Sequence, residues 1–200
     1  NIAVILPERP VKILLSSDSG ETWRESTVEG SESMYAFGEE RYDILYLSGW
    51  IGSFGEDGMY LALGGGLAMG SQPISLFISR DNGATWRETD DPYHQGVYRG
   101  VMTGVAFATA ETGFVCYRYY EDAGPVVYRT LDGGETWSRL EIEPPEGYSS
   151  DRYRWVFTPE SPVFDGNSGV MPVTALDQDT GESTQLELCT QDGGLTWSWG

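Results

Sequence analysis

An eight-residue pattern occurs four times in the chain and constrains the fold more than any other feature of the sequence. The pattern is S/T-x-D-x-G-x-T-W, and its aspartates are 63, 51 and 60 residues apart. An aspartate in a tight turn accepts hydrogen bonds from backbone N–H groups just ahead of it, and a glycine two positions on supplies a positive φ without steric cost. Threonine and tryptophan then begin a return strand. The pattern therefore predicts four hairpin turns, at Ser16–Trp23, Ser79–Trp86, Thr130–Trp137 and Thr190–Trp197.

The composition favours an all-β fold around these turns. The 200 residues include 26 Gly and 10 Pro together with 7 Trp, 12 Tyr and 7 Phe. This mixture is typical of many short strands joined by tight turns. No segment carries a sustained 3.6-residue apolar period, so we expect little or no helix. A chain of this length can bury one substantial core, and we expect a single domain over residues 1–200.

The repeated pattern resembles the Asp box, or bacterial neuraminidase repeat, of sialidases, some xyloglucanases, sortilin-type receptors and photosystem II assembly factors. In those families each box joins the third and fourth strands of a four-stranded propeller blade, at the periphery and away from the central ligand site. The resemblance implies a β-propeller of about four blades, approximately residues 1–30, 40–90, 100–143 and 152–200. It implies a structural rather than catalytic role for the box residues Asp18, Gly20, Trp23, Asp81, Gly83, Trp86, Asp132, Gly134, Trp137, Asp192, Gly194 and Trp197.

Apolar runs between the boxes supply the strands that such blades need. Their connections are rich in Gly, Pro, Asp and Ser, as turns require. In the last three blades we expect strands at Tyr42–Ser48, Met59–Gly64, Ile74–Arg80, Thr85–Thr89, Met102–Ala108, Phe114–Tyr120, Val126–Leu131, Thr136–Ile142, Arg154–Thr158, Gly169–Leu176, Thr184–Gln191 and Leu195–Trp199.

The first blade has too few strands. Only Ile2–Leu6 and Val11–Ser17 precede the first box, so this blade has three strands and lacks the innermost one. We expect Ile2–Leu6 to pair with Val11–Ser17, and Leu195–Trp199 to be the outer strand of the last blade. Unpaired strand edges are costly, so the open edge is expected to be paired with another chain, covered by a neighbouring segment or exposed in a partial ring. The chain forms either a compact four-bladed ring or a piece of a larger propeller.

The charge of the chain restricts its partners. Its formal net charge is −19, with 31 acidic residues against 12 Lys and Arg. Such a charge repels nucleic acid and anionic membrane surfaces, while neutral glycans and proteins remain acceptable ligands. No stretch reaches the roughly 18 apolar residues of a membrane span. The resemblance points to an extracellular or cell-envelope protein, whose signal peptide would lie outside this sequence.

The sequence holds few candidates for metal or redox chemistry. Cys116 and Cys189 lie in apolar strand patterns, and we expect two buried free thiols rather than a zinc site or disulfide. The single histidine, His94, is expected in a surface loop. No cofactor is required. Asp177 and Asp179, in an acidic strand connection, are weak calcium candidates because their spacing matches no complete calcium loop.

The catalytic residues of a sialidase are not evident. The resemblance would require a Tyr–Glu pair, an acid/base Asp and three Arg, the first in a Phe/Tyr-Arg-Ile-Pro motif that this chain lacks. Arg24, Arg87 and Arg139 follow box tryptophans and are interpreted as edge charges. The remaining candidates for a ligand-binding face are Arg99, Arg118, Arg152, Arg154 and Tyr148, the last within the long connection Glu143–Arg152.

Three functional hypotheses follow from these observations. The first is a non-enzymatic propeller that binds a protein or glycan at one face. The second is a sialidase-like glycoside hydrolase, or a fragment of one, with catalytic residues at unrecognised positions. The third is a structural or assembly protein that self-associates by accepting a strand at its open blade edge.

Overall fold

The computed structural model describes residues 2–35, 41–42, 46–67, 70–95, 100–119, 123–148 and 154–200. Strands are the regular elements in these ranges, and none of them contains a helix. Within them no helix is therefore long and apolar enough to cross a membrane. The strands are β1 (Ile2–Leu6), β2 (Val11–Ser16), β3 (Arg24–Val28), β4 (Met34–Tyr35), β5 (Arg41–Tyr42), β6 (Ser48–Phe54), β7 (Gly58–Gly64), β8 (Ile74–Ser79), β9 (Arg87–Thr89), β10 (Val101–Phe107), β11 (Gly113–Arg118), β12 (Val126–Thr130), β13 (Ser138–Arg139), β14 (Trp155–Pro159), β15 (Val163–Asp165), β16 (Ser168–Asp177), β17 (Ser183–Thr190) and β18 (Ser198–Trp199).

These strands form four antiparallel blades in chain order, as the resemblance implied. The second blade is β6-β7-β8-β9, the third is β10-β11-β12-β13, and the fourth is β14-β16-β17-β18. In the fourth blade β15 also pairs with β16, beyond the end of β14, so the inner strand is interrupted rather than continuous. In these three blades the Asp box connects the third strand to the fourth, and in the first blade it connects β2 to β3. The all-β propeller fold is confirmed.

The first blade has three strands in the order β1-β2-β3, which confirms the count made from the sequence. Ile2 lies opposite Ser16 and Leu6 lies opposite Lys12, so β1 and β2 form the expected hairpin. The outer strand of the last blade is β18, as expected, although it is shorter than Leu195–Trp199.

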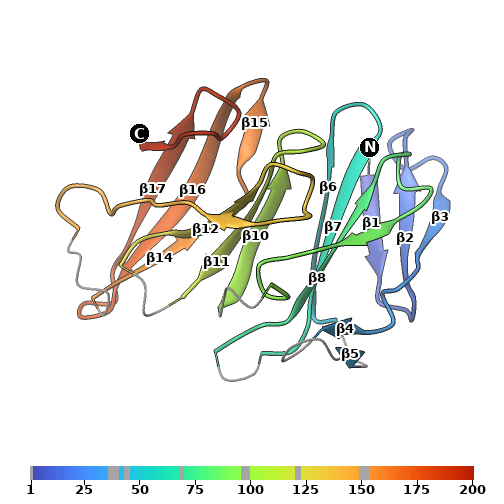
Figure 1. Cartoon of the computed structure of the whole chain (residues 1–200), viewed down its shortest axis with the longest axis horizontal. Coiled ribbons are helices and arrows are strands. Elements are labelled where there is room, and N and C mark those ends of the chain that lie inside the picture. Colours follow the sequence, from blue (N-terminus) through green and yellow to red (C-terminus); the bar gives the residue numbers. More distant parts are fainter. Residues whose placement is uncertain are drawn as a thin grey trace.

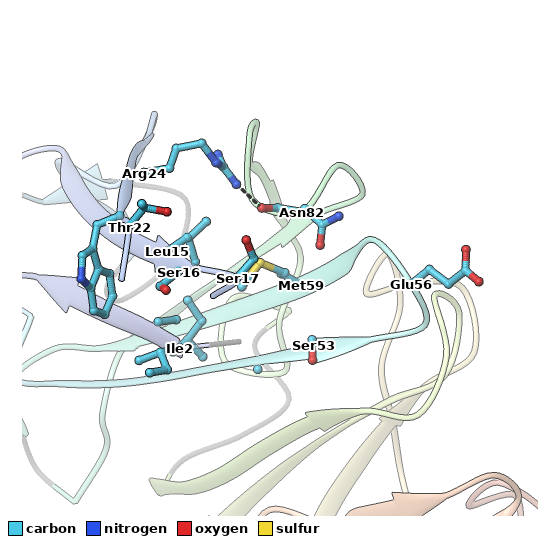
Figure 2. Close-up of a pocket in the computed structure, with 14 residues that line it drawn as sticks. Ile2, Leu15, Ser16, Ser17, Thr22, Arg24, Ser53, Glu56, Met59 and Asn82 are labelled. Carbon is cyan, nitrogen blue, oxygen red and sulfur yellow. Dashed lines mark hydrogen bonds between the residues drawn. The ribbon is translucent and has the colours of Figure 1, made fainter. Parts of the chain in front are cut away.

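The four blades form an open arc rather than a closed ring. In Figure 1 the first blade stands at one end of the molecule and β16 and β17 of the last blade stand at the other. A cavity of about 690 Å³, shown in Figure 2, lies between the first and second blades and is lined by residues of β1, β2, β3, β6 and β7. Among the described strands β1 pairs only with β2. The described chain is thus part of a propeller, with an exposed edge on its first blade.

One predicted strand was wrong. The inner strand of the second blade is β6, not Tyr42–Ser48, whose residues 43–45 lie outside the described part of the chain. Glycines inside β6 hid it, because glycine is unfavourable in strands. They are needed there for close packing: a Cβ on Gly49 would lie 2.8 Å from the Ile5 side chain, and one on Gly52 would lie 2.3 Å from the Tyr60 hydroxyl. The short β4–β5 hairpin was also not anticipated.

The core consists of three apolar layers, one between each pair of neighbouring blades. The first includes Ile13, Leu63 and Phe77, and Trp86 of the second box packs against it. The second includes Phe107 and Trp137, whose rings meet edge to face at 6.3 Å. The third includes the fully buried side chains of Phe114, Met171, Val173 and Leu188.

The two cysteines differ in burial. Both are free thiols, as expected, but only Cys116 is fully buried, while Cys189 is partly exposed on the last blade. Burial raises the pKa of the Cys116 thiol far above its ordinary value. The expectation of two buried thiols is therefore correct for Cys116 and wrong for Cys189, which lies on the face of β17 that no further blade covers.

Candidate functional site

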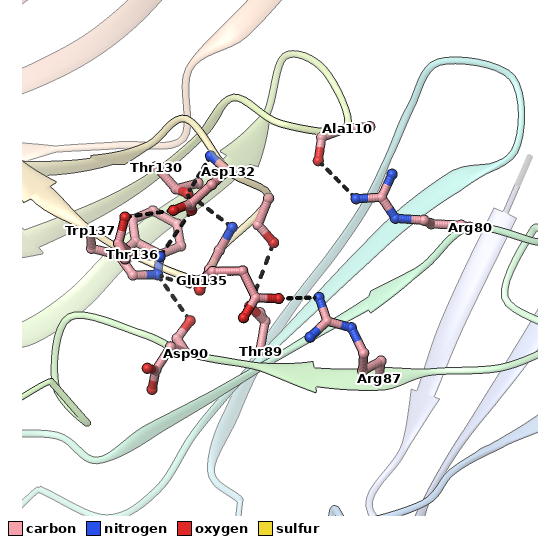
Figure 3. A network of polar contacts seen from close by, with 12 residues as sticks. Arg80, Arg87, Thr89, Asp90, Ala110, Thr130, Asp132, Glu135, Thr136 and Trp137 are labelled. Carbon is pink, nitrogen blue, oxygen red and sulfur yellow. Dashed lines mark hydrogen bonds and ion pairs between the residues drawn. The ribbon is translucent and has the colours of Figure 1, made fainter.

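All four Asp boxes make the same hydrogen bonds, and the third box is shown in Figure 3. The Asp132 carboxylate accepts the Thr130 hydroxyl at 2.7 Å, the Thr136 N–H at 2.9 Å and the Thr136 hydroxyl at 2.6 Å. The Gly134 N–H donates to the Thr130 hydroxyl at 2.9 Å, with φ of +96° at Gly134. The other boxes repeat these contacts around Asp18, Asp81 and Asp192.

These hydrogen bonds stabilise the ionised form of the box aspartates. The threonine hydroxyl and N–H four residues on lower the pKa of Asp18, Asp81 and Asp192 to about 2. The carboxylates are therefore charged acceptors at neutral pH and unsuited to donate a proton. This chemistry agrees with the structural role expected for the boxes.

The boxes also join neighbouring blades, which sequence reasoning missed. Arg24 of the first blade donates to the Asn82 carbonyl at 2.6 Å and the Gly83 carbonyl at 3.3 Å in the second box. Arg129 donates in the same way to the Leu195 carbonyl of the fourth box at 2.6 Å. Arg87 forms an ion pair with Glu135 of the third box at 2.7 Å (Figure 3). Arg24 and Arg87, interpreted above as edge charges, are therefore contacts between blades.

Two of the box tryptophans also form hydrogen bonds with the preceding blade. The Trp86 indole N–H donates to Ser26 Oγ of the preceding blade at 3.0 Å, and that of Trp137 donates to the Asp90 carbonyl at 2.9 Å. Trp23 of the first box bonds its own turn at Gly20 and is 44% exposed. The sequence feature that could have indicated these contacts between blades is the arginine that directly follows Trp23 and Trp86.

Replacing Asp132 by alanine is expected to lower the free energy of unfolding by about 1–3 kcal/mol, because the N–H and hydroxyl groups of the turn lose their acceptor. Urea titration followed by tryptophan fluorescence measures the loss, and Asp165→Ala, at the exposed end of β15, is the control. Ligand binding by the folded variant should match the wild type. A variant that melts like the wild type but loses ligand affinity would contradict the structural role.

The predicted ligand-face residues that the structure describes lie at the opposite end of the blades. Gly113 pairs with Thr130 at the box end, so Arg118 lies at the end of β11 that is remote from the box. Arg154 precedes β14 at the same end of the last blade. Arg99 and Arg152 lie outside the described residues.

Tyr148 and Arg154 are brought together by one aromatic ring, while Arg118 lies on a different blade. The Tyr148 and Trp155 rings are 4.7 Å apart at 59°, and the Arg154 guanidinium lies 5.5 Å from the centre of the Trp155 ring. The Tyr148 ring also approaches Phe157 at 5.9 Å. These residues form a partly exposed aromatic surface with a guanidinium at its rim.

Asp177 fixes the position of this guanidinium. Its carboxylate is 3.1 Å from Arg154 Nη2 and accepts the Asp179 N–H at 2.9 Å. Burial raises its pKa, but the hydrogen bonds from Asp179 and Arg154 outweigh burial and hold the pKa below its usual value. In the described part of the chain, no group of three His, Cys, Asp or Glu side chains is arranged to hold a metal ion. Calcium binding at Asp177 and Asp179 stays a prediction.

The turn after β9 contains a buried carboxyl that sequence reasoning overlooked. Asp91 is 3% exposed and accepts the His94 N–H at 2.8 Å. Burial raises the pKa of Asp91 to about 7. The His94 ring contacts the Asp90 carboxylate and is only partly exposed, rather than fully at the surface. The same turn contains Asp90, whose backbone carbonyl accepts the Trp137 indole N–H. The turn therefore forms part of the contact between the second and third blades.

A cavity lies near this aromatic surface, beside Trp199. Phe157 connects Tyr148 to Trp199, with ring centres of Phe157 and Trp199 at 6.3 Å. Next to Trp199 is a cavity of about 360 Å³, which we call the Trp199 groove; it is lined by Pro145, Pro172, Gln185, Leu186, Glu187, Trp199 and Gly200. No sequence pattern indicates this cavity, because its lining residues come from four separate segments.

Comparison with known proteins agrees with the repeat and the fold. A model of the BNR/Asp-box repeat matches residues 77–88 and 128–139, the second and third boxes. The chain therefore contains BNR/Asp-box repeats. No protein of curated function matches it in sequence.

Solved structures similar to the chain include an arabinase and a sialidase. An endo-arabinase from Bacteroides thetaiotaomicron aligns with a TM-score of 0.51 and 11% identity, over 99% of this chain and 78% of the arabinase. The NanB sialidase from Streptococcus pneumoniae aligns with a TM-score of 0.49 and 15% identity, over 95% of this chain. The chain spans 28% of the length of that sialidase.

Proposed function

We propose that this chain is a non-catalytic, extracellular or cell-envelope propeller module that binds a glycan at the blade end opposite the Asp boxes. The observation that carries the proposal is the surface formed by Tyr148, Trp155 and Arg154, where two aromatic rings and a guanidinium adjoin at 4.7 and 5.5 Å. Its position agrees with the resemblance, which locates ligands away from the boxes.

The chemistry of this surface suits a sugar chain. The apolar C–H face of a sugar ring packs on an aromatic ring, and a planar guanidinium can donate two parallel hydrogen bonds to neighbouring oxygens. Asp177 holds Arg154 in one orientation, which reduces the entropy that binding would otherwise cost. Protein ligands would use the same aromatic and arginine groups, and are the alternative within this proposal.

The proposal is tested by electrophoresis of the purified chain through gels containing debranched arabinan, xyloglucan or a sialylated glycoprotein. At least one polymer is expected to retard the wild type, and Tyr148→Ala should weaken that retardation by about tenfold through the lost ring contact. Trp23→Ala is the matched control, because Trp23 is an exposed aromatic residue at the far end of the arc. Equal migration of wild type and Tyr148→Ala in every gel would contradict the proposal.

A glycoside hydrolase is the second candidate. The observation in its favour is that the arabinase-like propeller fold extends over almost the whole chain. The same protein should be incubated with arabinan, β-glucan and fluorogenic sialosides, and released reducing ends or fluorophore measured. Turnover that a single carboxylate substitution abolishes would replace the binding module by an enzyme.

An assembly role is the third candidate, and the open edge of the first blade supports it. Among the described strands β1 pairs only with β2, its Ile2 and Val4 side chains are 43% and 41% exposed, and Ile2 lines the cavity of Figure 2. A strand edge of this kind pairs readily with a strand from another subunit. Light scattering would detect such association as a mass above that of one chain, and a strict monomer at high concentration would count against it.

A further inference from the structure

The second, third and fourth Asp boxes each receive a side chain from the blade before them. A Cβ added to the second glycine of each box would clash with that side chain, which is Leu15 at Gly83, Thr89 at Gly134 and Phe114 at Gly194. All three glycines are buried. Glycine at this position therefore does more than allow the turn, because it also makes room for a group from the preceding blade.

An arginine lies beside each inserted side chain. The pairs are Arg24 opposite Leu15, Arg87 two positions before Thr89 on β9, and Arg129 opposite Phe114. As described above, these guanidinium groups bind backbone carbonyls or a glutamate of the same box that receives the side chain. Each contact between blades thus combines an inserted side chain with an arginine on the turn.

The first box presents the same receiving groups without such a cover from the described chain. A Cβ on Gly20 would meet only Trp23 and Ile2 among the described residues, both in the first blade, and Gly20 itself is partly exposed. Trp23 is 44% exposed, the most of the four box tryptophans. Glu21 is exposed and occupies the position in its box at which Glu135 binds Arg87 in the third box.

The surface around Gly20 is apolar and faces away from the second blade. Ala3 and Ile5 of β1 pack in the layer between the first and second blades. Ile2 and Val4 alternate with them along the strand, so they lie on the opposite face, where they are 43% and 41% exposed. A partner that covered the first box would therefore also cover apolar side chains of β1.

We propose that the first Asp box is a docking site for the β-sheet of a separate, basic protein, which packs an apolar side chain against Gly20 and Trp23 and an arginine against Glu21. The Ser19 carbonyl, at the position of Asn82 in the second box, is a further acceptor for this arginine. The three contacts between blades of this chain define what the box accepts. The site goes beyond the proposed glycan binding, which lies at the other end of the blades, and uses the face of the first blade rather than its strand edge.

A second copy of the chain does not supply the matching surface. On the last blade Cys189 lies opposite Ser198, at the positions that Leu15 and Arg24 have on the first blade, so neither position carries an arginine. The same face of β17 carries the exposed Glu187, which would approach Glu21. The net charge of −19 also repels another copy and attracts a basic protein at long range.

The test titrates the ¹⁵N-labelled chain with a backbone-cyclised hairpin peptide that carries leucine directly opposite arginine. Saturable shifts are expected at the backbone N–H signals of Gly20 and Glu21 and at the indole N–H of Trp23. The matched peptide carries citrulline in place of arginine. It should bind about tenfold more weakly, because citrulline retains the shape of the side chain but not its charge. Raised salt should weaken the arginine peptide alone.

Variants of the chain locate the binding surface. Trp23→Ala should weaken binding of the arginine peptide by about tenfold, because the exposed ring is the main apolar contact. Glu21→Gln should weaken it by about threefold through loss of the ion pair, and this exposed substitution keeps the test valid if Trp23→Ala unfolds. Leu195→Ala is the matched control, since Leu195 has the position of Glu21 in the fourth box, is 52% exposed and should leave binding unchanged.

The outcomes separate this proposal from its alternatives. Absence of shifts at Gly20 and Trp23, or equal binding of the arginine and citrulline peptides, would overturn it. Self-association of the wild type that Trp23→Ala abolishes, measured by light scattering, would show that the partner is a second copy and would overturn the assignment to a separate basic protein. Glycan retardation in the gels above is independent of Trp23, so either proposal can fail without the other.

Discussion

Asp91→Asn is expected to raise the free energy of unfolding at pH 8 by up to about 4 kcal/mol relative to wild type. The pKa of Asp91 is about 7 in the folded protein against an ordinary value of 3.8. Burial is the main cause, and the neighbouring carboxylates Asp90 and Glu88 add to it. Asparagine is uncharged and retains the oxygen that accepts the His94 N–H. The variant therefore removes the cost of a buried charge and preserves the turn.

The sign of the pH dependence follows from this raised pKa. Below about pH 4 Asp91 is neutral in both the folded and unfolded states, and its stabilising contribution is fully present. As the pH rises toward 7 the unfolded state ionises first, so that contribution is lost. The Asp-box carboxylates behave in the opposite sense: their pKa values near 2 contribute stability above about pH 4, which is lost as the pH falls through 2.

Urea titrations at intervals from pH 4 to pH 8 measure this dependence. Wild type should lose stability across the interval, and Asp91→Asn should lose much less. Asp165→Asn is the control, because Asp165 is an exposed carboxylate on β15 of the last blade and is not among the groups that raise the pKa of Asp91. Parallel stability curves for wild type and Asp91→Asn would show that the buried carboxyl does not titrate in this range.

Gly104→Ala is expected to lower the free energy of unfolding by about 3 kcal/mol. A Cβ at this position would lie 2.3 Å from the Ser161 nitrogen and 2.7 Å from the Glu160 carbonyl carbon, both in the backbone of the last blade. Neither atom belongs to a flexible side chain, so the inner strand β10 and the segment after β14 would have to separate. That movement would also stretch the hydrogen bond from the Val105 N–H to the Ser161 hydroxyl, which is 3.0 Å.

Gly66→Ala is the matched control for this substitution. A Cβ on Gly66 would meet only the Leu47 side chain, at 3.8 Å, and should change stability by less than about 0.5 kcal/mol. Thermal unfolding by calorimetry compares the two variants with wild type. Equal melting temperatures for Gly104→Ala and Gly66→Ala would mean that the third and fourth blades are not held together at this contact.

The Asp boxes show how far local sequence can be interpreted. Each box places its donors and acceptors within eight residues, so the contacts of Asp132 with Thr130 and Thr136 depend only on the turn itself. The number of blades and the three-stranded first blade followed from the order of boxes and apolar runs. The inner strand of the second blade could not be predicted in this way, because its glycines are explained only by packing against Ile5 and Tyr60, which come from other strands.

The candidate site was predicted in part. Tyr148 and Arg154 were named from composition and loop length, but their shared partner Trp155 emerged only from the ring contacts. Trp199 was interpreted as part of an outer strand, and nothing near it in sequence indicates Gln185 or Pro145 as neighbours.

The sequence by itself determined the repeated turn, the all-β propeller fold and the order of its blades, because these depend on residues a few positions apart. Only the tertiary structure decided which groups meet across blades. Arg24 binds a carbonyl 58 positions away, and Trp199 binds one 56 positions away. Asp91 is buried in a turn whose Asp90 carbonyl accepts the Trp137 indole N–H from the next blade. Contacts over such separations depend on how blades pack, and no local pattern of residue types records that geometry.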